Sequence, residues 1–277
     1  MGSRPRYARG GDVMKEVRPI VIKIGETRID RDAMRRVLRE VGASARTIES
    51  YFEKRENDGE NLIEFAGRIC YESYEPQLNP NVSRIRTRPS EYFGNILRAG
   101  DGSILEHSWQ SFALLNLSRV CTHEIVRHRV GVAISQESLR YVRPRDIRFW
   151  IPDELNEVHR RAVREAVEHS EETYRALEKM IPWDEMSMDE KKRLTSALRR
   201  ILPDGLATHM IWSANHRTLR WLIEMRTAAS AEVEIRMVFD QIADICRRDF
   251  PNLYGDFVST DLPDGTKSWT PTIRSKV

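Results

Sequence analysis

The sequence predicts an α+β fold, a single helix-rich domain with a smaller mixed sheet. Charge-rich segments repeat apolar residues at helical spacing, and shorter segments alternate or run apolar as strands do. No internal repeat or shift in composition marks a linker. We therefore expect residues 17–277 to form one domain. Residues 1–16 are basic and contain Gly, which is typical of a disordered or tag-like start.

The first half of the chain is predicted to contribute one strand and three helices. Gly42 and Gly100 stand where helices commonly end, because glycine accepts the left-handed backbone that closes a helix. A segment rich in Pro and Asn precedes the last of these helices. The predicted elements are a strand at residues 20–24 and helices at residues 31–42, 60–73 and 90–100.

The second half is predicted to add two strands and most of the helix. Ser118 and Asn215 are suited to cap the helices that follow the two strands, because their side-chain oxygens accept from free helical N–H groups. Pro203 and Gly205 break the helical pattern. The predicted strands are residues 109–117 and 206–215, and the predicted helices begin after Ser118 and cover residues 156–180, 187–202, 216–226 and 231–250, the last closing the chain.

Composition limits the functional classes. Of the 277 residues, 45 are Lys or Arg and 42 are Asp or Glu, so a net charge of +3 gives no global attraction to nucleic acid or membrane. The longest apolar stretches are too short to span a bilayer, and the first residues lack the apolar core of a signal peptide. Three scattered Cys fit a reducing compartment. We expect a cytoplasmic protein without a membrane or nucleic-acid polymer as partner.

A zinc site is not expected in the segment that begins at Thr122. His123-Glu124 followed by His128 resembles a zinc-protease helix, but there the two His are four residues apart. A spacing of five separates the side chains by about 140° on a regular helix. No cysteine pair offers further ligands, so we expect no bound metal.

The same segment is rich in arginine. Seven Arg and no Lys lie between Arg119 and Arg148, a bias that favours planar, bidentate recognition of phosphate or carboxylate. Gln136, Ser135 and Ser138 lie among them and are suited to a base edge or a sugar hydroxyl. Composition alone allows an Arg-rich subunit interface equally well.

In the same segment, Arg127-His128-Arg129 is followed by Ser138-Leu139-Arg140-Tyr141. These residues resemble the signature of the flavin-dependent thymidylate synthases, a family that methylates deoxyuridylate with flavin and folate. Further blocks match the family in order: LIEFAGRICYES from Leu62, GSILEHSWQSF from Gly102, SRVCTHEIVRHR from Ser118, ALRRILP from Ala197 and SANHRTLRWLIEMR from Ser213. The resemblance covers roughly residues 57–250.

The sequence also departs from the family pattern. Eight residues instead of seven separate Arg129 from Ser138, so the substrate loop is one residue longer and contains Gly131. Asp101, Trp221 and Ser230 replace residues common in the family, which affects details of the flavin pocket. Residues 25–56 are interpreted as an insertion.

The resemblance implies residue roles position by position. The flavin contacts it implies are Ser103, Arg127, His128, Arg129, Gln136, Asn215, His216 and Arg217. The nucleotide contacts are Glu124, Arg127, Gln136, Ser138, Arg140, Arg199 and Arg226, with the backbone around Glu137 and Leu139. Arg226 is the candidate catalytic residue, because a guanidinium near the uracil ring stabilises developing charge. Ser138 is expected to bind and not to attack, because no activating base accompanies it.

The implied reaction is reductive methylation of dUMP to dTMP. Methylenetetrahydrofolate gives the carbon, and FAD reduced by NADPH gives the hydride. No Gly-x-Gly-x-x-Gly motif is present, so Arg donors and helix ends would hold the flavin in place of a Rossmann turn. The resemblance also implies a homotetramer with sites between chains.

Two alternatives stay open. The same scaffold could act on UMP or another pyrimidine nucleotide, since no residue pattern shows whether the site accepts or rejects a 2′-hydroxyl on the sugar. A non-catalytic nucleotide- or RNA-binding module is the second, but within the Arg-rich segment only Tyr141 offers an aromatic surface for stacking.

Overall fold

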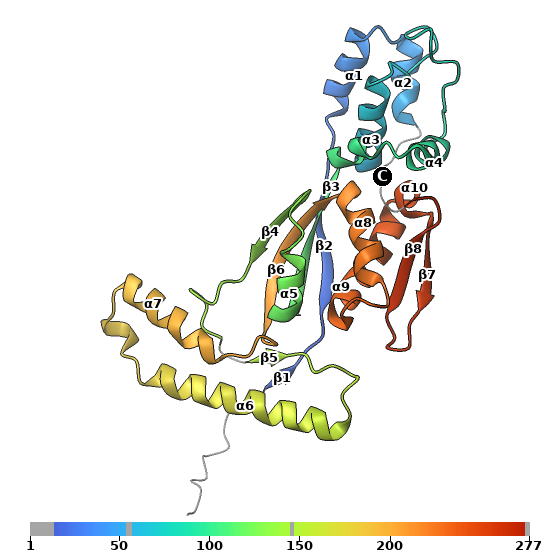
Figure 1. Cartoon of the computed structure of the whole chain (residues 1–277). Coiled ribbons are helices and arrows are strands. Elements are labelled where there is room, and N and C mark those ends of the chain that lie inside the picture. Colours follow the sequence, from blue (N-terminus) through green and yellow to red (C-terminus); the bar gives the residue numbers. More distant parts are fainter. Residues whose placement is uncertain (1–13, 54–56, 145–146, 275–277) are drawn as a thin grey trace, which may run out of the picture. The chain divides into compact units, whose positions relative to one another are not determined.

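The computed structural model describes residues 14–53, 57–144 and 147–274. These form a helix-rich α+β fold, as the sequence predicts (Figure 1). Internal contacts divide the chain into two compact units. Among the described residues, the first comprises residues 14–18, 116–123, 136–144 and 147–209, and the second residues 19–53, 57–115, 124–135 and 210–274. Neither unit is continuous in sequence, which explains why composition shows no boundary.

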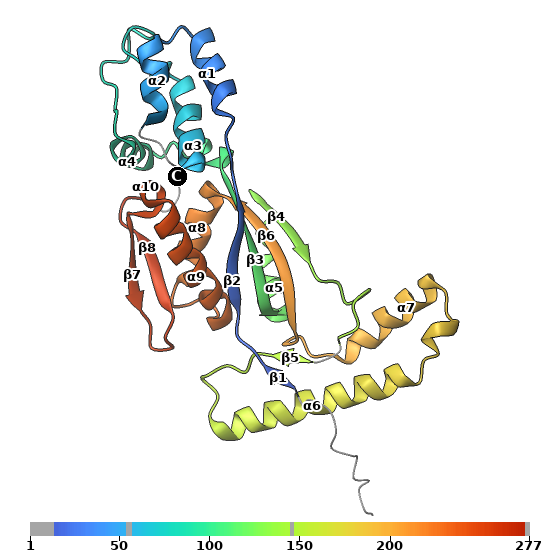
Figure 2. The same cartoon turned by 180° about the vertical axis from the view of Figure 1, so that it is seen from behind.

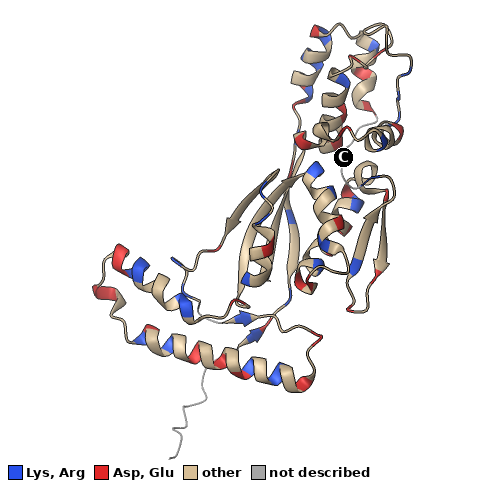
Figure 3. Ribbon diagram, viewed as in Figure 1, with Lys and Arg blue, Asp and Glu red and all other residues tan. Residues whose placement is uncertain are grey.

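The first unit is built on long helices and a small sheet. Its elements are β1 (Lys15–Glu16), β5 (Arg148–Phe149), α6 (Glu157–Lys179), η2 (Trp183–Glu185), α7 (Met188–Leu198) and η3 (Arg199–Ile201). Strands β1 and β5 pair in parallel. Leu139, Ile151 and Tyr174 are buried in its hydrophobic cluster. Acidic and basic residues alternate along α6 and α7 (Figure 3), as expected for helices with one solvated face.

The N-terminal segment differs from its prediction in part. Residues 1–13 of the expected tag-like start lie outside the described residues. Met14, however, is buried in the hydrophobic cluster of the first unit, and Lys15 and Glu16 pair with β5. The last three residues of the predicted tag therefore belong to the folded structure, because the Met14 side chain is buried and Lys15 and Glu16 pair with Arg148 and Phe149.

The second unit contains most of a four-stranded sheet of order β2-β3-β6-β4. Its strands are β2 (Ile20–Glu26), β3 (Trp109–Ser118), β6 (Ala207–Asn215) and β4 (Val132–Gln136), and residues of β3, β4 and β6 are divided between the units. Phe112 of β3 stacks on Trp212 of β6 with ring centroids 6.1 Å apart, and Trp212 contacts Phe239 edge-on. One face of the sheet is thus covered by apolar side chains.

Helices complete the second unit. They are α1 (Arg31–Glu40), α2 (Ala45–Glu53), α3 (Asp58–Ile69), α4 (Pro89–Ala99), η1 (Gly102–His107), α5 (Arg119–Ile125, shared with the first unit), α8 (His216–Thr227), α9 (Val233–Asp249) and α10 (Pro251–Tyr254). A hairpin of β7 (Phe257–Asp261) and β8 (Lys267–Pro271) follows. No helix in the described ranges has both the length and the apolarity to cross a membrane.

Three local predictions were incomplete. The interpreted insertion, residues 25–56, contains the unpredicted helix α2, whose Tyr51 and Phe52 pack with Phe65 of α3. The substrate loop is largely the strand β4, and the chain closes on the β7–β8 hairpin instead of a helix.

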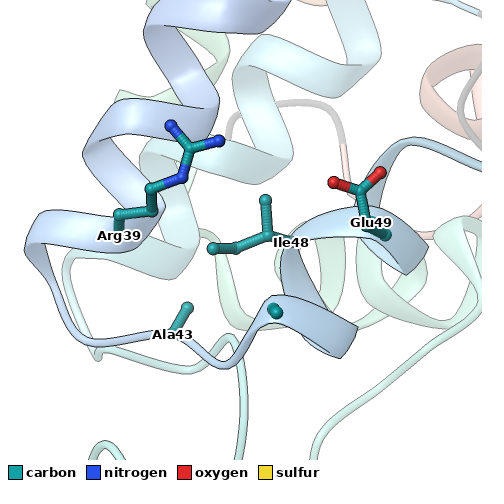
Figure 4. Close-up of a pocket in the computed structure, with 5 residues that line it drawn as sticks. Arg39, Ala43, Ile48 and Glu49 are labelled. Atoms are coloured by element: carbon teal, nitrogen blue, oxygen red, sulfur yellow. The ribbon is translucent and has the colours of Figure 1, made fainter.

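A pocket between α1 and α2 is lined by Arg39, Ala43, Ala45, Ile48 and Glu49 (Figure 4), none of which is a predicted site residue.

Candidate functional site

Arg226, at the C-terminal end of α8, is the centre of a polar cluster. Its Nε donates to Nε2 of His128 at 2.8 Å, and its Nη1 pairs with Oε2 of Glu124 at 2.9 Å. The remaining nitrogen, Nη2, has no hydrogen bond within the described residues. The Arg226 side chain is only 17% exposed, so this cation is held in a fixed direction with one nitrogen left to bind a ligand.

His128 is neutral in this cluster. Its Nε2 accepts from Arg226, so the ring proton lies on Nδ1. Burial lowers the pKa of His128, and the positive charges of Arg226 and Arg127 lower it further. Trp221 packs edge-on against the imidazole with ring centroids 5.6 Å apart. The imidazole therefore orients Arg226 by accepting its hydrogen bond, and it adds no positive charge at neutral pH.

We predict that Arg226→Ala raises the pKa of His128 toward the ordinary histidine value of 6.5. Removing the guanidinium eliminates a nearby like charge and admits water, and both changes favour the imidazolium. NMR titration of the histidine ring signals checks this result. An unchanged or lower pKa in the variant would show that Arg226 does not control the charge of His128.

The Arg127–Arg129 turn is anchored to the start of α8. Arg127 and Arg129 lie beyond α5, which ends at Ile125. Gly131 has φ +67°, and its carbonyl accepts from the Asn215 N–H. The Thr218 hydroxyl donates to the carbonyl of Val130 at 3.0 Å. These bonds fix the turn to the N-terminus of α8.

The guanidinium groups of Arg127 and Arg129 are exposed, and within the described residues neither forms an ion pair. The Asn215 side chain caps α8 by accepting from the Thr218 N–H at 2.9 Å. The helix N-terminus carries a partial positive charge, so this part of the site favours an anionic group such as a pyrophosphate.

Two further predicted flavin contacts, Arg217 and Ser103, lie in α8 and in η1. Arg217 in the first turn of α8 pairs with Glu106 of η1 at 2.6 Å, and both side chains are about half exposed. Ser103, also in η1, is exposed. Both residues are therefore accessible to a ligand, whereas the Arg217 charge is already balanced by a carboxylate.

The side chain of His216, a predicted flavin contact, lies in the core of this structure. His216 is fully buried, its Nδ1 lies 2.8 Å from the Tyr254 hydroxyl, and its ring packs against Phe250. Burial lowers its pKa to about 3, with smaller contributions from Arg220 and Lys23. The position after the helix cap points into the core, so His216 is a structural residue.

We predict that His216 makes the protein sensitive to acid. Its folded pKa of about 3 lies below the ordinary 6.5, so the unfolded chain binds the proton more readily. Its contribution is present above pH 6.5 and is lost as the pH falls toward 3, by up to about 1.4 kcal/mol for each pH unit. Urea unfolding of wild type and His216→Gln between pH 7 and 4 measures the difference, and equal slopes would contradict it.

The predicted nucleotide contacts 136–140 and Arg199 lie in the first unit. The Ser138 hydroxyl accepts from the Arg140 N–H at 3.3 Å, and the Ser138 carbonyl accepts from the N–H groups of Tyr141 and Val142. Leu139 is buried in the same cluster against which Leu198 packs, so the turn and the end of α7, followed by Arg199, share one core. Arg140 is exposed.

Two predicted nucleotide contacts are partly engaged in the fold. Gln136, at the end of β4, donates to the Thr122 hydroxyl at 3.1 Å. The Glu137 N–H donates to the carbonyl of His209, so this amide is not free to bind phosphate in the structure. The exposed donor for an anion in this turn is therefore the Arg140 guanidinium, with the half-buried Ser138 hydroxyl nearby in the chain.

Sequence reasoning missed two residues that shape the site. Thr122 accepts a hydrogen bond from Gln136, and Thr218 holds the Arg127–Arg129 turn. Thr218 lies three residues after the predicted cap Asn215, a spacing that could have indicated its buried position. No local pattern marks Thr122. Among the described residues, no group of three or more His, Cys, Asp or Glu could hold a metal ion.

The chain is similar in sequence and in fold to known proteins. A family model described as thymidylate synthase complementing protein matches residues 52–252. Flavin-dependent thymidylate synthases of Mycobacterium tuberculosis are 33% identical over 79% of this chain and 87% of their own length, and that of Mycobacterium marinum is 34% identical over 79% and 88%. A solved structure of a UMP/dUMP methylase, PolB from Streptomyces cacaoi, bound with 5-Br UMP, superposes with a TM-score of 0.60 at 15% identity, over 87% of this chain and 95% of that one.

Proposed function

The chain belongs to the flavin-dependent thymidylate synthase family, and from this premise we propose that it methylates C5 of deoxyuridylate to give thymidylate. It is a methyltransferase that uses FAD, with NADPH and methylenetetrahydrofolate as co-substrates. The observation that supports the assignment best is the Glu124–Arg226–His128 cluster, in which a cation with a free N–H is held next to the family's arginine-rich turn.

The residues present fit a flavin dinucleotide. A pyrophosphate needs cationic or N–H donors, and Arg127 and Arg129 are exposed guanidiniums next to the capped N-terminus of α8. The Asn215 amide and Ser103 add polar groups on the adjacent elements. We infer that these residues hold the cofactor, with Arg217 available once it exchanges Glu106 for the ligand.

Bound FAD supplies the hydride that it receives from NADPH. Arg226 is then the group that acts on the base. Its free Nη2 donates to a uracil carbonyl and stabilises the negative charge that develops in the ring, while Glu124 and His128 keep the guanidinium plane in place.

The phosphate of the nucleotide is assigned to the turn from Ser138 to Arg140. Arg140 supplies an exposed charge, and Leu139 anchors the turn in the hydrophobic cluster. Arg199 follows the α7 helix that packs against the same cluster, so it is a second cation for the phosphate. Gln136 is suited to the base or sugar, since its side-chain carbonyl can accept while its amide donates to Thr122.

We predict that Ser138→Ala weakens nucleotide binding and keeps measurable turnover. The Ser138 hydroxyl accepts a backbone N–H, and within the described residues no His or carboxylate hydrogen bonds to it, so it lacks the base that a nucleophile needs. Steady-state kinetics should show a raised KM for dUMP with kcat nearly unchanged. Mass spectrometry that finds a covalent adduct of substrate on Ser138 would refute this role.

Self-association into a homotetramer is also proposed, and one face of the sheet supports it. Ile20, Ile22 and Ile24 of β2 are 45%, 47% and 53% exposed, and Ile20 and Ile22 stand opposite Leu115 and Ala113 of β3. Among the helices of the second unit, none crosses in front of β2 in Figure 2. A contiguous apolar patch of this kind is typical of a protein–protein interface.

The exposed face continues onto β6. Ser111 of β3 and Ser213 of β6 hydrogen bond at 2.7 Å, and Ile211 alternates with the buried Trp212, so Ile211 lies on the same face as Ser213. Ile211 is 42% exposed. We propose that a second copy covers this face and that the Ser138–Arg140 turn of one protomer completes the site around Arg226 of another.

A second substrate remains a specific alternative. The solved structure with a TM-score of 0.60 is that of a UMP/dUMP methylase, which supports testing UMP beside dUMP. The non-catalytic nucleotide- or RNA-binding module has less support, because the chain belongs to a family of methyltransferases.

The test of the cofactor assignment is direct. Purified protein should show visible flavin absorption or take up FAD with measurable heat, because Arg127, Arg129 and Asn215 form a matching donor set. Arg127→Ala should lower the affinity, whereas Arg161→Ala, which removes an exposed α6 side chain paired with Glu165, should not. Protein that stays colourless and gives no heat with FAD would contradict the proposed function.

A further inference from the structure

The β7–β8 hairpin is attached to the end of the helix that carries Arg226. The N–H of Trp269 in β8 donates to the Thr227 hydroxyl at 2.9 Å. The same hydroxyl donates to the carbonyl of Ile223 one turn back at 2.7 Å. Thr227 and Trp269 are buried, so water does not replace this bond easily. The hairpin therefore closes the last turn of α8 directly after Arg226.

A second attachment holds the segment that follows. Arg236 of α9 donates to the carbonyls of Ala229, at 2.9 Å, and Ala231. Its other nitrogen pairs with Asp264 in the hairpin turn, and its Nε donates to the Thr266 hydroxyl at 3.3 Å. Arg236 is 5% exposed. One guanidinium thus joins the hairpin turn to the chain three to five residues after Arg226.

The hairpin turn itself is internally braced. Asp264 accepts from the Thr266 N–H at 3.0 Å and from the Thr266 hydroxyl at 2.6 Å. The indole of Trp269 donates to Asp240 of α9 at 2.7 Å, which fixes β8 to that helix. These bonds give the hairpin a defined position within the second unit. Through Trp269 and Arg236 the hairpin in turn holds Thr227 and the carbonyls of Ala229 and Ala231 in place.

Helix ends fray when nothing holds their last carbonyls and the chain beyond them. Arg226 is the penultimate residue of α8, so fraying there would turn its guanidinium away from Glu124 and His128. The family model ends at residue 252, and the hairpin begins at Phe257. The hairpin residues of the two attachments, Trp269 and Asp264, therefore lie outside the matched family region.

We propose that the β7–β8 hairpin positions Arg226 for catalysis by clamping Thr227 through Trp269 and the segment from Ala229 to Ala231 through Asp264 and Arg236. This inference rests on the proposed function, because it assigns the hairpin a role only if Arg226 acts on the nucleotide. Asp264, Thr227 and Trp269 are positioning residues, since they reach the substrate only through Arg226.

The test is a double-mutant cycle with two readouts, kcat and the calorimetric dissociation constant of dUMP. Asp264→Asn and Thr227→Val are each made alone and together with Arg226→Ala. The control is Asp261→Asn, an exposed aspartate of β7 in the same hairpin. With Arg226 present, each variant should lower kcat about tenfold and weaken dUMP binding, because a misplaced catalytic group costs turnover even when it is retained.

In the Arg226→Ala background, the same substitutions should cause no further loss in either readout, since the side chain they position is gone. Equal losses with and without Arg226 would overturn the inference and leave the hairpin a general stabilising element. Unchanged kcat and dUMP binding in both single variants would also overturn it. If Asp264→Asn fails to fold, Thr227→Val decides. Full turnover of Arg226→Ala itself would refute the catalytic assignment of the proposed function, and the positioning role with it.

Discussion

Arg226→Ala is expected to lower the turnover number by about 10²-fold or more, equivalent to about 3 kcal/mol of transition-state stabilisation. The guanidinium is the only cation that the structure holds between Glu124 and His128, among the residues it describes. Its loss removes the charge that meets the developing negative charge of the base. Steady-state kinetics with saturating dUMP, folate and NADPH measures the effect on kcat.

The control for this substitution is Arg161→Ala, because the Arg161–Glu165 pair on α6 is largely exposed, with side chains 77% and 61% accessible. Such a surface pair contributes little. Flavin content should be equal in wild type and both variants. A kcat for Arg226→Ala within a fewfold of wild type would contradict the catalytic assignment.

Mixing variants tests whether the site is shared between protomers. Arg226→Ala and Arg140→Ala should each be nearly inactive alone, and mixed oligomers should regain part of the activity, because some sites then combine an intact Arg226 with an intact Arg140. Subunit exchange is established first by native mass spectrometry. Exchange without recovered activity would favour a site contained within one chain.

Gly131→Ala is expected to disrupt the flavin side of the site. Gly131 has φ +67°, a conformation that costs an alanine about 1 to 2 kcal/mol. An added Cβ would lie 2.6 Å from the Asn215 amide nitrogen and closer still to the Thr218 hydroxyl. Relief of this overlap displaces the cap of α8 or the Arg127–Arg129 turn, so FAD affinity should fall about tenfold or more.

Gly265→Ala is the matched control, because Gly265 also has a positive φ, +79°, but an added Cβ there meets nothing within 4 Å. Both variants force alanine into a left-handed backbone conformation, whereas only in Gly131→Ala does the added Cβ overlap with neighbouring side chains. Calorimetric titration with FAD and thermal unfolding separate binding from stability. Equal FAD affinity in the two variants would show that the turn does not hold the cofactor.

Local signals in the sequence predicted much of the fold. The capping residues Ser118 and Asn215 accept from helix N–H groups as expected, and Gly100 closes α4 with φ +82°. These features depend on a few neighbouring residues, so sequence patterns determine them. The helix α2, the strand β4 and the β7–β8 hairpin escaped prediction because they are short and depend on partners distant in the chain.

In the candidate site, too, some features follow from neighbouring residues and others depend on residues distant in the chain. Family resemblance selected Glu124, His128 and Arg226, and their mutual contacts bridge about a hundred residues, which no spacing rule predicts. His216 lies between the two predicted contacts Asn215 and Arg217, yet its side chain points into the core toward Tyr254. The resemblance identified the segment, but of these three consecutive residues only Arg217 is exposed, whereas Asn215 and His216 are buried.

The most direct test of the central claim is formation of thymidylate by the purified protein. With FAD, NADPH, methylenetetrahydrofolate and dUMP, mass spectrometry should detect dTMP, and UMP in place of dUMP should be methylated more slowly or not at all. The reaction should be lost when FAD or NADPH is omitted and strongly reduced in Arg226→Ala. Methylation of UMP in preference to dUMP would reassign the substrate, and the absence of product from both nucleotides with fully bound flavin would contradict the proposed function.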